Sequence, residues 1–160
     1  MIDISLLIGE RLTYISRAAD MLVLSFGDDI CRNYRGDWLS RYALHCQCAW
    51  RITDGHGKIV LARVDIFSPP EGEDYTLDFD WDVRGNNAFD RKSGEILSGG
   101  EVTVTSARLI NGCDIELELS NGLRFESFAD SSLEEHWRLV VRDEDNPVQL
   151  VAEPTGIREV

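Results

Sequence analysis

The sequence predicts a mainly β protein: an antiparallel, pseudo-symmetric arrangement of two β repeats, either a sandwich or a barrel, with one or two short helical turns. Three observations lead to this fold class. Apolar and polar residues alternate with a period of two in several segments, two Asn-Gly pairs mark tight hairpin turns, and one pattern of residues occurs twice. No window shows helical periodicity over a length that would favour an α/β fold.

The repeated pattern spans residues 7–68 and 97–157. A length of 160 residues suits one domain, so we expect a single domain, 1–160, in which an acidic connecting segment, 69–96, joins the two repeats. The offset between matching positions is 90, then 93, then 87, in three pairs of segments: 7–16 with 97–106, 22–26 with 115–119, and Trp50-Arg51 with Trp137-Arg138.

The first repeat should contain five strands. The clearest is the segment 42–52, in which the even positions are apolar and include Cys46, Cys48 and Trp50. A short helix or loop is expected at 36–41. The strands are expected at 12–17, 21–26, 30–34, 42–52 and 59–67.

The connecting segment begins with a break at Ser68-Pro69-Pro70. Residues 75–81 then alternate between apolar and polar side chains, which predicts another strand. Residues 85–87 and 92–94 are expected to form loops, because they are rich in Gly, Asn and Ser.

The second repeat has the strongest turn signals, Asn111-Gly112 and Asn121-Gly122, because both central residues of a type I′ turn need positive φ. They predict a meander of three strands. Ser131 and Glu134 have the spacing of a capping box, which predicts one or two helical turns. The strands of this repeat are expected at 102–109, 114–120, 123–128, from Trp137 to Val141, and at 147–152.

The meander, the run Asn121-Gly122-Leu123-Arg124-Phe125 and the Ser-rich turn before Trp137-Arg138-Leu139 form one pattern. It resembles small bacterial domains of unknown function that occur as tandem β units. The resemblance covers the whole chain, and it implies no activity, no cofactor and no catalytic residue.

The charge is strongly acidic and uneven. There are 16 basic and 29 acidic residues, a net charge of −13, and residues 1–68 are neutral, so the whole excess lies in the second half. Phosphate backbones and anionic membranes attract clustered Lys and Arg, so neither nucleic acid nor a membrane is an expected partner. A basic protein would be attracted by this field, whereas net negative charge can also simply serve solubility.

No motif for catalysis or metal binding emerges. His45-Cys46-Gln47-Cys48 contains zinc-ligand types, but the spacing is wrong and residue 45 should point away from the two thiols on a strand. Cys46 and Cys48 are expected to pack in the core. We expect no cofactor, no metal and no catalytic residue, and Cys113 is the best single thiol to test.

Asp78, Asp80 and Asp82 are the candidate partner-binding residues. On a strand they would share one face about 7 Å apart and repel each other unless a cation or a basic partner lay there. A solvated face is the simpler alternative, and a calcium loop is not expected, because Val83 and Phe89 replace its Gly and Glu.

The leading hypothesis is therefore a non-enzymatic protein-interaction module, one form of which is an acidic inhibitor or immunity-type protein that neutralises a basic toxin. The alternatives are a small-molecule-binding β barrel and an enzyme in which a histidine meets a carboxylate or Cys113. The N-terminal residues lack the basic and apolar regions of a signal peptide, so a cytoplasmic location is expected. A homodimer through an unpaired edge strand remains open.

Overall fold

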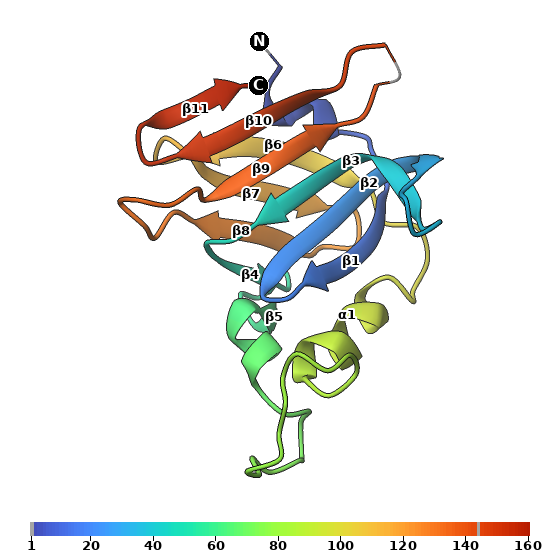
Figure 1. Cartoon of the computed structure of the whole chain (residues 1–160), viewed down its shortest axis with the longest axis vertical. Coiled ribbons are helices and arrows are strands. Elements are labelled where there is room, and N and C mark those ends of the chain that lie inside the picture. Colours follow the sequence, from blue (N-terminus) through green and yellow to red (C-terminus); the bar gives the residue numbers. More distant parts are fainter. Residues whose placement is uncertain (1, 144) are drawn as a thin grey trace.

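Two antiparallel sheets pack face to face in the computed structural model, which describes residues 2–143 and 145–160 (Figure 1). The six-stranded sheet has the order β1 (Leu12–Ala18), β2 (Met21–Arg32), β3 (Trp38–Cys46), β9 (Trp137–Val141), β10 (Val148–Glu153) and β11 (Gly156–Glu159). The five-stranded sheet has the order β5 (Ile59–Ala62), β4 (Ala49–Thr53), β8 (Arg124–Phe128), β7 (Asp114–Leu119) and β6 (Val104–Ile110).

The predicted fold class is confirmed as a sandwich, and the barrel alternative is wrong, because two separate sheets enclose the core. Each half of the chain supplies a meander to one sheet and further strands to the other. If β1–β5 are matched with β6–β10, the neighbours within the sheets are the same in both halves. The two halves are joined within each sheet, by the pairing of β3 with β9 in the six-stranded sheet and by the equivalent pairing of β8 with β4 in the five-stranded sheet.

The expected strand 42–52 is wrong in one respect, because the chain changes sheets within it. β3 ends at Cys46 and β4 begins at Ala49 in the opposite sheet. The N–H groups of Gln47 and Cys48 both donate to the carbonyl of His136, over 2.9 and 3.2 Å, which fixes this corner to the crossover from β8 to β9. The even-numbered residues point into the core both before and after the change of sheet, because both sheets face the same core.

Other expected elements also differ from the structure. Residues 30–34 form no separate strand, since β2 continues to Arg32, and Trp38 to Arg41 belong to β3. The expected strand 59–67 stops at Ala62 and becomes the 3-10 helix η2 (Arg63–Phe67). Ser131 accepts the N–H groups of Leu133 and Glu134, yet no helical turn follows.

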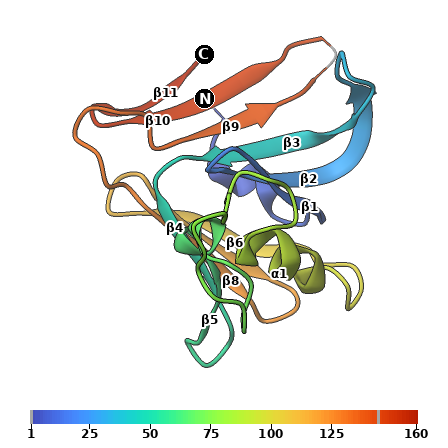
Figure 2. The same ribbon diagram turned by 60° about the horizontal axis from the view of Figure 1, so that its bottom comes forward.

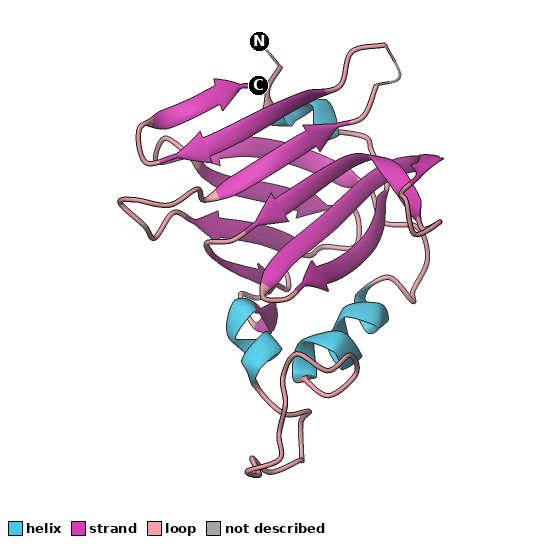
Figure 3. Cartoon of the chain, viewed as in Figure 1, coloured by secondary structure: helices cyan, strands magenta, loops and turns pink. Residues whose placement is uncertain are grey.

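The helix α1 (Ala88–Ile96) occupies the expected loop 92–94 (Figure 3). The side chain of Asn87 caps it by accepting the Asp90 N–H over 2.7 Å. Phe89 is 1% exposed and lies edge-on against Trp50, 5.8 Å between ring centroids. The helix therefore forms because Phe89 joins the core at the sandwich end near β1, and tertiary packing of this kind overrides weak propensity.

The core consists of the inward side chains of both sheets together with η1 (Ile4–Leu7), η2 and α1. Leu24, Leu44, Leu117, Phe125 and Leu139 are at most 1% exposed. None of the helices in the described residues has the length and apolar character needed to cross a membrane.

Candidate functional site

The chain between η2 and α1 projects away from the sandwich (Figure 1). We name residues 71–82 the acidic arm. This segment of twelve residues holds six carboxylates and no Lys or Arg. The three predicted residues Asp78, Asp80 and Asp82 all lie in it and are exposed. The acidic arm therefore presents six carboxylates on one projection of the fold.

Aromatic contacts fold the acidic arm onto its own base. Phe67 of η2 and Trp81 lie edge-to-face with ring centroids 4.9 Å apart. The Tyr75 hydroxyl donates to the Phe67 carbonyl over 3.2 Å, and the Tyr75 ring lies 5.5 Å from that of Phe79. These contacts give the acidic arm a defined shape, because Tyr75 and Trp81 are both held at Phe67.

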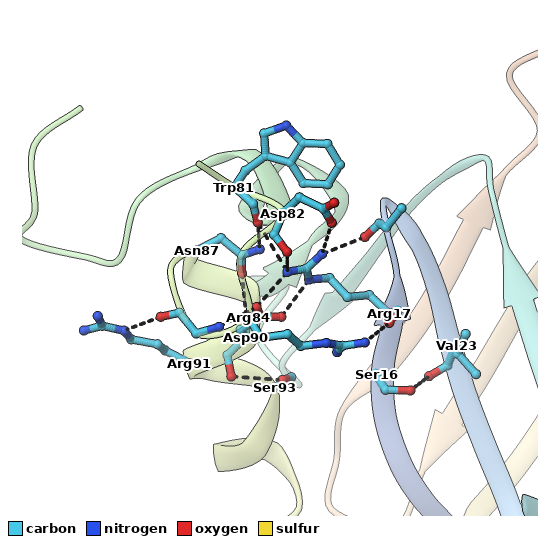
Figure 4. A network of polar contacts seen from close by, with 12 residues as sticks. Ser16, Arg17, Val23, Trp81, Asp82, Arg84, Asn87, Asp90, Arg91 and Ser93 are labelled. Atoms are coloured by element: carbon cyan, nitrogen blue, oxygen red, sulfur yellow. Dashed lines mark hydrogen bonds and ion pairs between the residues drawn. The ribbon is translucent and has the colours of Figure 1, made fainter. Parts of the chain in front are cut away.

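Arg17 fastens the base of the acidic arm to the sandwich (Figure 4). Its side chain is 1% exposed and forms two hydrogen bonds to the Asp90 carboxylate, over 2.8 and 2.9 Å. It also donates to the Asp82 carboxylate over 3.2 Å and to the Trp81 carbonyl over 3.3 Å. One guanidinium thus joins β1, α1 and the acidic arm.

The electrostatics of this network favour the ion pair. Burial opposes the charge on Asp90, but the hydrogen bonds from Arg17 and from the Gly85 N–H, together with the positive charges of Arg17 and Arg84, outweigh it and hold the pKa of Asp90 below its ordinary value of 3.8. The hydrogen bond to Asp90 raises the pKa of Arg17 in turn. Both groups therefore stay charged at neutral pH, and bidentate Arg–carboxylate geometry is the strongest form of such a pair.

The predicted strand at 75–81 is absent, so the three aspartates do not share a strand face. The acidic arm is built from turns, in which the Asp80 carboxylate accepts the Asp82 N–H over 3.0 Å. Asp82 is engaged by Arg17, whereas no hydrogen bond of the Asp78 side chain occurs in the described part of the chain. Asp78 is therefore the aspartate best placed to meet a partner, and Asp82 serves the fold.

Apolar side chains are exposed among these carboxylates. Leu77 is 106% exposed and Tyr75 is 68% exposed, although both belong to a segment whose shape is fixed by contacts with Phe67. An apolar centre with a polar rim is the usual anatomy of a protein–protein interface. The sequence reveals the charge of this segment, but only the structure reveals that Leu77 stands clear of the rest of the molecule.

Cys46 and Cys48 lie in the core as expected, 0% and 3% exposed, with their Sγ atoms 3.5 Å apart. A hydrogen bond with Cys48 and burial raise the pKa of the Cys46 thiol, which keeps it protonated. Cys113 is partly buried, and burial raises its pKa as well. Over residues 2–143 and 145–160 no group of three or more His, Cys, Asp or Glu side chains could hold a metal ion.

The three histidines lie in three separate places. His45 is on the outer face of the six-stranded sheet, His56 is exposed in the turn after β4, and His136 is 3% exposed at the crossover before β9. Of these, His45 borders a hollow that also contains Glu135. The hypothesis of a histidine paired with Cys113 finds no such arrangement among the described residues.

Comparison with protein-family models, with curated proteins and with solved structures finds no match for this chain.

Proposed function

We propose that this protein is a non-enzymatic interaction module that binds a basic protein through the acidic arm. The observation that carries the proposal is the exposure of Leu77 in the middle of a segment that holds six carboxylates and no Lys or Arg. Such a segment offers both parts of an interface, an apolar anchor and a ring of charge around it.

The charge supplies selection and speed. A chain with a net charge of −13 attracts basic proteins over long range and repels acidic ones. The acidic arm concentrates this field where the backbone projects furthest. Association should therefore be fast at low salt and should weaken as ions screen the carboxylates.

The anchoring supplies affinity. The contacts of Phe67 with Trp81 and of Arg17 with Asp82 hold the acidic arm in one shape before any partner arrives. Less conformational entropy is then lost on binding than for a disordered acidic segment. A basic partner with an apolar pocket for Leu77 fits this surface, and an inhibitor or immunity-type protein against a basic toxin would be one such case.

The test is capture of proteins from a lysate of the source organism on immobilised wild-type protein and variants, at low and at raised salt, with identification by mass spectrometry. Leu77→Asp removes the apolar anchor, and Asp78→Lys reverses a charge that takes no part in holding the acidic arm. We expect a basic protein to be retained by the wild type at low salt and lost from both variants. Asp82 is left unchanged, because its substitution would also disturb Arg17.

Matched controls separate the acidic arm from the rest of the surface. Leu133 is 84% exposed between β8 and β9, and Glu134 beside it is also exposed. Leu133→Asp and Glu134→Lys make the same chemical changes away from the acidic arm and should retain the partner. Equal capture by all four variants, or retention of acidic proteins only, would refute the proposal.

A further inference from the structure

The outer face of the six-stranded sheet carries a hollow with a volume of about 870 Å³. Its floor is formed by outward side chains of β1, β2 and β3, among them Ser16, Val23 and Ala43. The C-terminal part of α1 borders it at one side, through Gly94 and Leu97, and the β2–β3 hairpin at another. We name this hollow the outer groove. It is separate from the acidic arm, none of whose residues line it.

Bulges in β2 build one wall of the outer groove. The pairing of β2 with β3 shifts register on both sides of Asp29, and the hairpin beyond it curls away from the five-stranded sheet (Figure 2). Gly27 permits this bend at φ +80°, and a Cβ there would lie 2.9 Å from a carboxylate oxygen of Glu10. Asp29 then accepts the hydroxyls of Tyr14 and Ser40, over 2.9 and 3.0 Å, which fixes two lining residues.

Arg142 brings a cation to the outer groove that no carboxylate of the described residues compensates. Arg142, just after β9, is half-buried and donates to the Ser40 carbonyl over 2.6 Å. Within residues 2–143 and 145–160, no carboxylate oxygen lies within 4 Å of its guanidinium. Burial lowers the pKa of Arg142, which reports the cost of keeping this charge partly out of water. An anion supplied from outside would relieve that cost.

His45 adds a second potential donor on the same floor. Burial lowers its pKa, with further contributions from the positive charges of Arg142 and Arg138, while Glu135 acts in the opposite direction. Arg138 is itself neutralised by Glu135, over 2.7 Å, so it does not compete with Arg142 for an anion. A bound anion would offset the positive charges that lower the pKa of His45. It would therefore favour the protonated imidazole.

The rest of the lining suits an uncharged, flat body. The aromatic residues Tyr14 and Trp38 are 44% and 51% exposed and border the outer groove, and most other polar groups there are hydroxyls. Asp37 is the only carboxylate among the described lining residues, and it already accepts the Asn33 amide over 3.1 Å. A metal cation, which needs several oxygen ligands of negative charge, is therefore poorly matched.

We propose that the outer groove binds a small organic anion, whose carboxylate or phosphate group pairs with Arg142 beside His45 and whose flat apolar body lies over the floor of β2 and β3. The volume is in the range of ordinary ligand pockets, and a few placed polar groups on a largely apolar lining are typical of them. Charge complementarity selects the class of ligand: the protein carries a net charge of −13, yet this site presents a guanidinium that pairs with no carboxylate of residues 2–143 and 145–160.

Four probes of similar size test the charge requirement. Phenyl phosphate and benzoate carry the two candidate head groups, benzyl alcohol is the neutral match, and benzylamine is the cationic match. Each is titrated into the ¹⁵N-labelled full chain at low salt and followed by amide chemical shifts. We expect saturable shifts from one or both anions that centre on Ser25, Ala43 and Arg142, and the stronger of the two identifies the head group.

Two variants locate the site. Arg142→Gln should weaken anion binding by about tenfold or more, since it removes a charged hydrogen-bond donor, whereas Arg142→Lys should recover part of the loss. Ser25→Phe leaves Arg142 intact and fills the floor, so it should abolish binding even if Arg142→Gln disturbs the fold. Binding of benzyl alcohol or benzylamine as tightly as the anions, no saturable binding of either anion, or anion binding unchanged in both Arg142→Gln and Ser25→Phe would overturn the proposal.

Discussion

The two meanders of this protein share a strand order but differ in length and in what covers their outer faces. In the first, β2 has 12 residues and β3 has 9, whereas their counterparts β7 and β8 have 6 and 5. The longer hairpin overhangs its sheet and walls the outer groove. The second meander ends at tight Asn-Gly turns and leaves no such overhang.

The outer faces differ in charge pairing as well. On the five-stranded sheet Arg51 lies 2.8 Å from Glu126, Arg124 lies 2.8 Å from Glu118, and Arg108 is paired with Glu116. The described arginines of that face are thus neutralised by neighbours on adjacent strands. On the six-stranded sheet Arg142 has no such partner in the described residues, so the two outer faces differ in how their arginines are paired.

Arg17 shows the same contrast inside the core. At the offset of 90 that relates the first strands of the halves, its counterpart is Ala107, which is 9% exposed. The second half needs only a small apolar side chain there, while the first half holds the acidic arm. What the halves share therefore makes the sandwich, and what they do not share makes the two candidate binding surfaces.

The largest expected effect comes from breaking the anchor that only the first half has. Arg17→Met leaves the carboxylate of Asp90 buried without its partner, which should lower the free energy of unfolding by about 3 to 5 kcal/mol. Urea denaturation measures this loss, and limited proteolysis should show faster cleavage within residues 68–87. Arg91→Met, which breaks the exposed pair with Glu73 and an exposed hydrogen bond to the Gly85 carbonyl, should cost less than about 1 kcal/mol.

The two matched tryptophans should respond differently to the same substitution. Trp137 donates its Nε1–H to the Cys113 carbonyl over 2.7 Å, whereas the buried Nε1 of Trp50 has no partner in the described residues. Trp137→Phe leaves a carbonyl unsatisfied, so it should cost about 1 to 2 kcal/mol more than Trp50→Phe. Equal losses in urea denaturation would mean that the two ends of the core are equivalent.

Glycine substitutions separate backbone strain from crowding in the longer hairpin. Gly36 has φ +87° with open space around its Cβ position, so Gly36→Ala should cost about 1 kcal/mol through strain alone. Gly27→Ala adds the close approach to Glu10 and should cost more. If thermal unfolding ranks them the other way, the bulge in β2 is not a fixed part of the outer groove.

The smallest effect is a dependence of stability on pH. The pKa of Asp90 is lower in the folded protein than its ordinary value of 3.8, so the stabilisation is complete above pH 3.8 and is lost as the pH falls through the folded pKa. Urea denaturation of the wild type should therefore show a decline below about pH 4 that Asp90→Asn reduces. Identical pH profiles would show that Asp90 does not titrate as part of this network.

Much of the sandwich could be predicted because its signals are local. The turns Asn111-Gly112 and Asn121-Gly122 locate β6, β7 and β8 to within two residues. The change of sheet at Gln47 could not be predicted, since inward alternation continues through it. The helix α1 was missed because its stability depends on distant partners, Phe89 in the core and Asp90 on Arg17.

The candidate sites were predictable only in part. The charge of Asp78, Asp80 and Asp82 is visible in the sequence, but the alternation at 75–81 falsely indicates a strand, because Tyr75 and Phe79 pack on each other in a turn. One signal could have revealed the anchor: Arg17 shares the inward face of β1 with Ile15, where an apolar residue is expected. No local sequence pattern indicates that Arg142 belongs to a binding site, because its lack of a carboxylate partner among the described residues depends on the arrangement of the whole sheet.

The most direct test of the division between shared fold and unshared function is to remove the acidic arm. Residues 71–79 are replaced by a short Gly-Ser linker, which keeps Trp81, Asp82 and the Arg17 network, and the variant is compared with the wild type in urea denaturation and in capture of the basic partner. We predict a free energy of unfolding within about 1 kcal/mol of the wild type and complete loss of capture. Capture that survives in the folded variant would contradict the assignment of partner binding to the acidic arm.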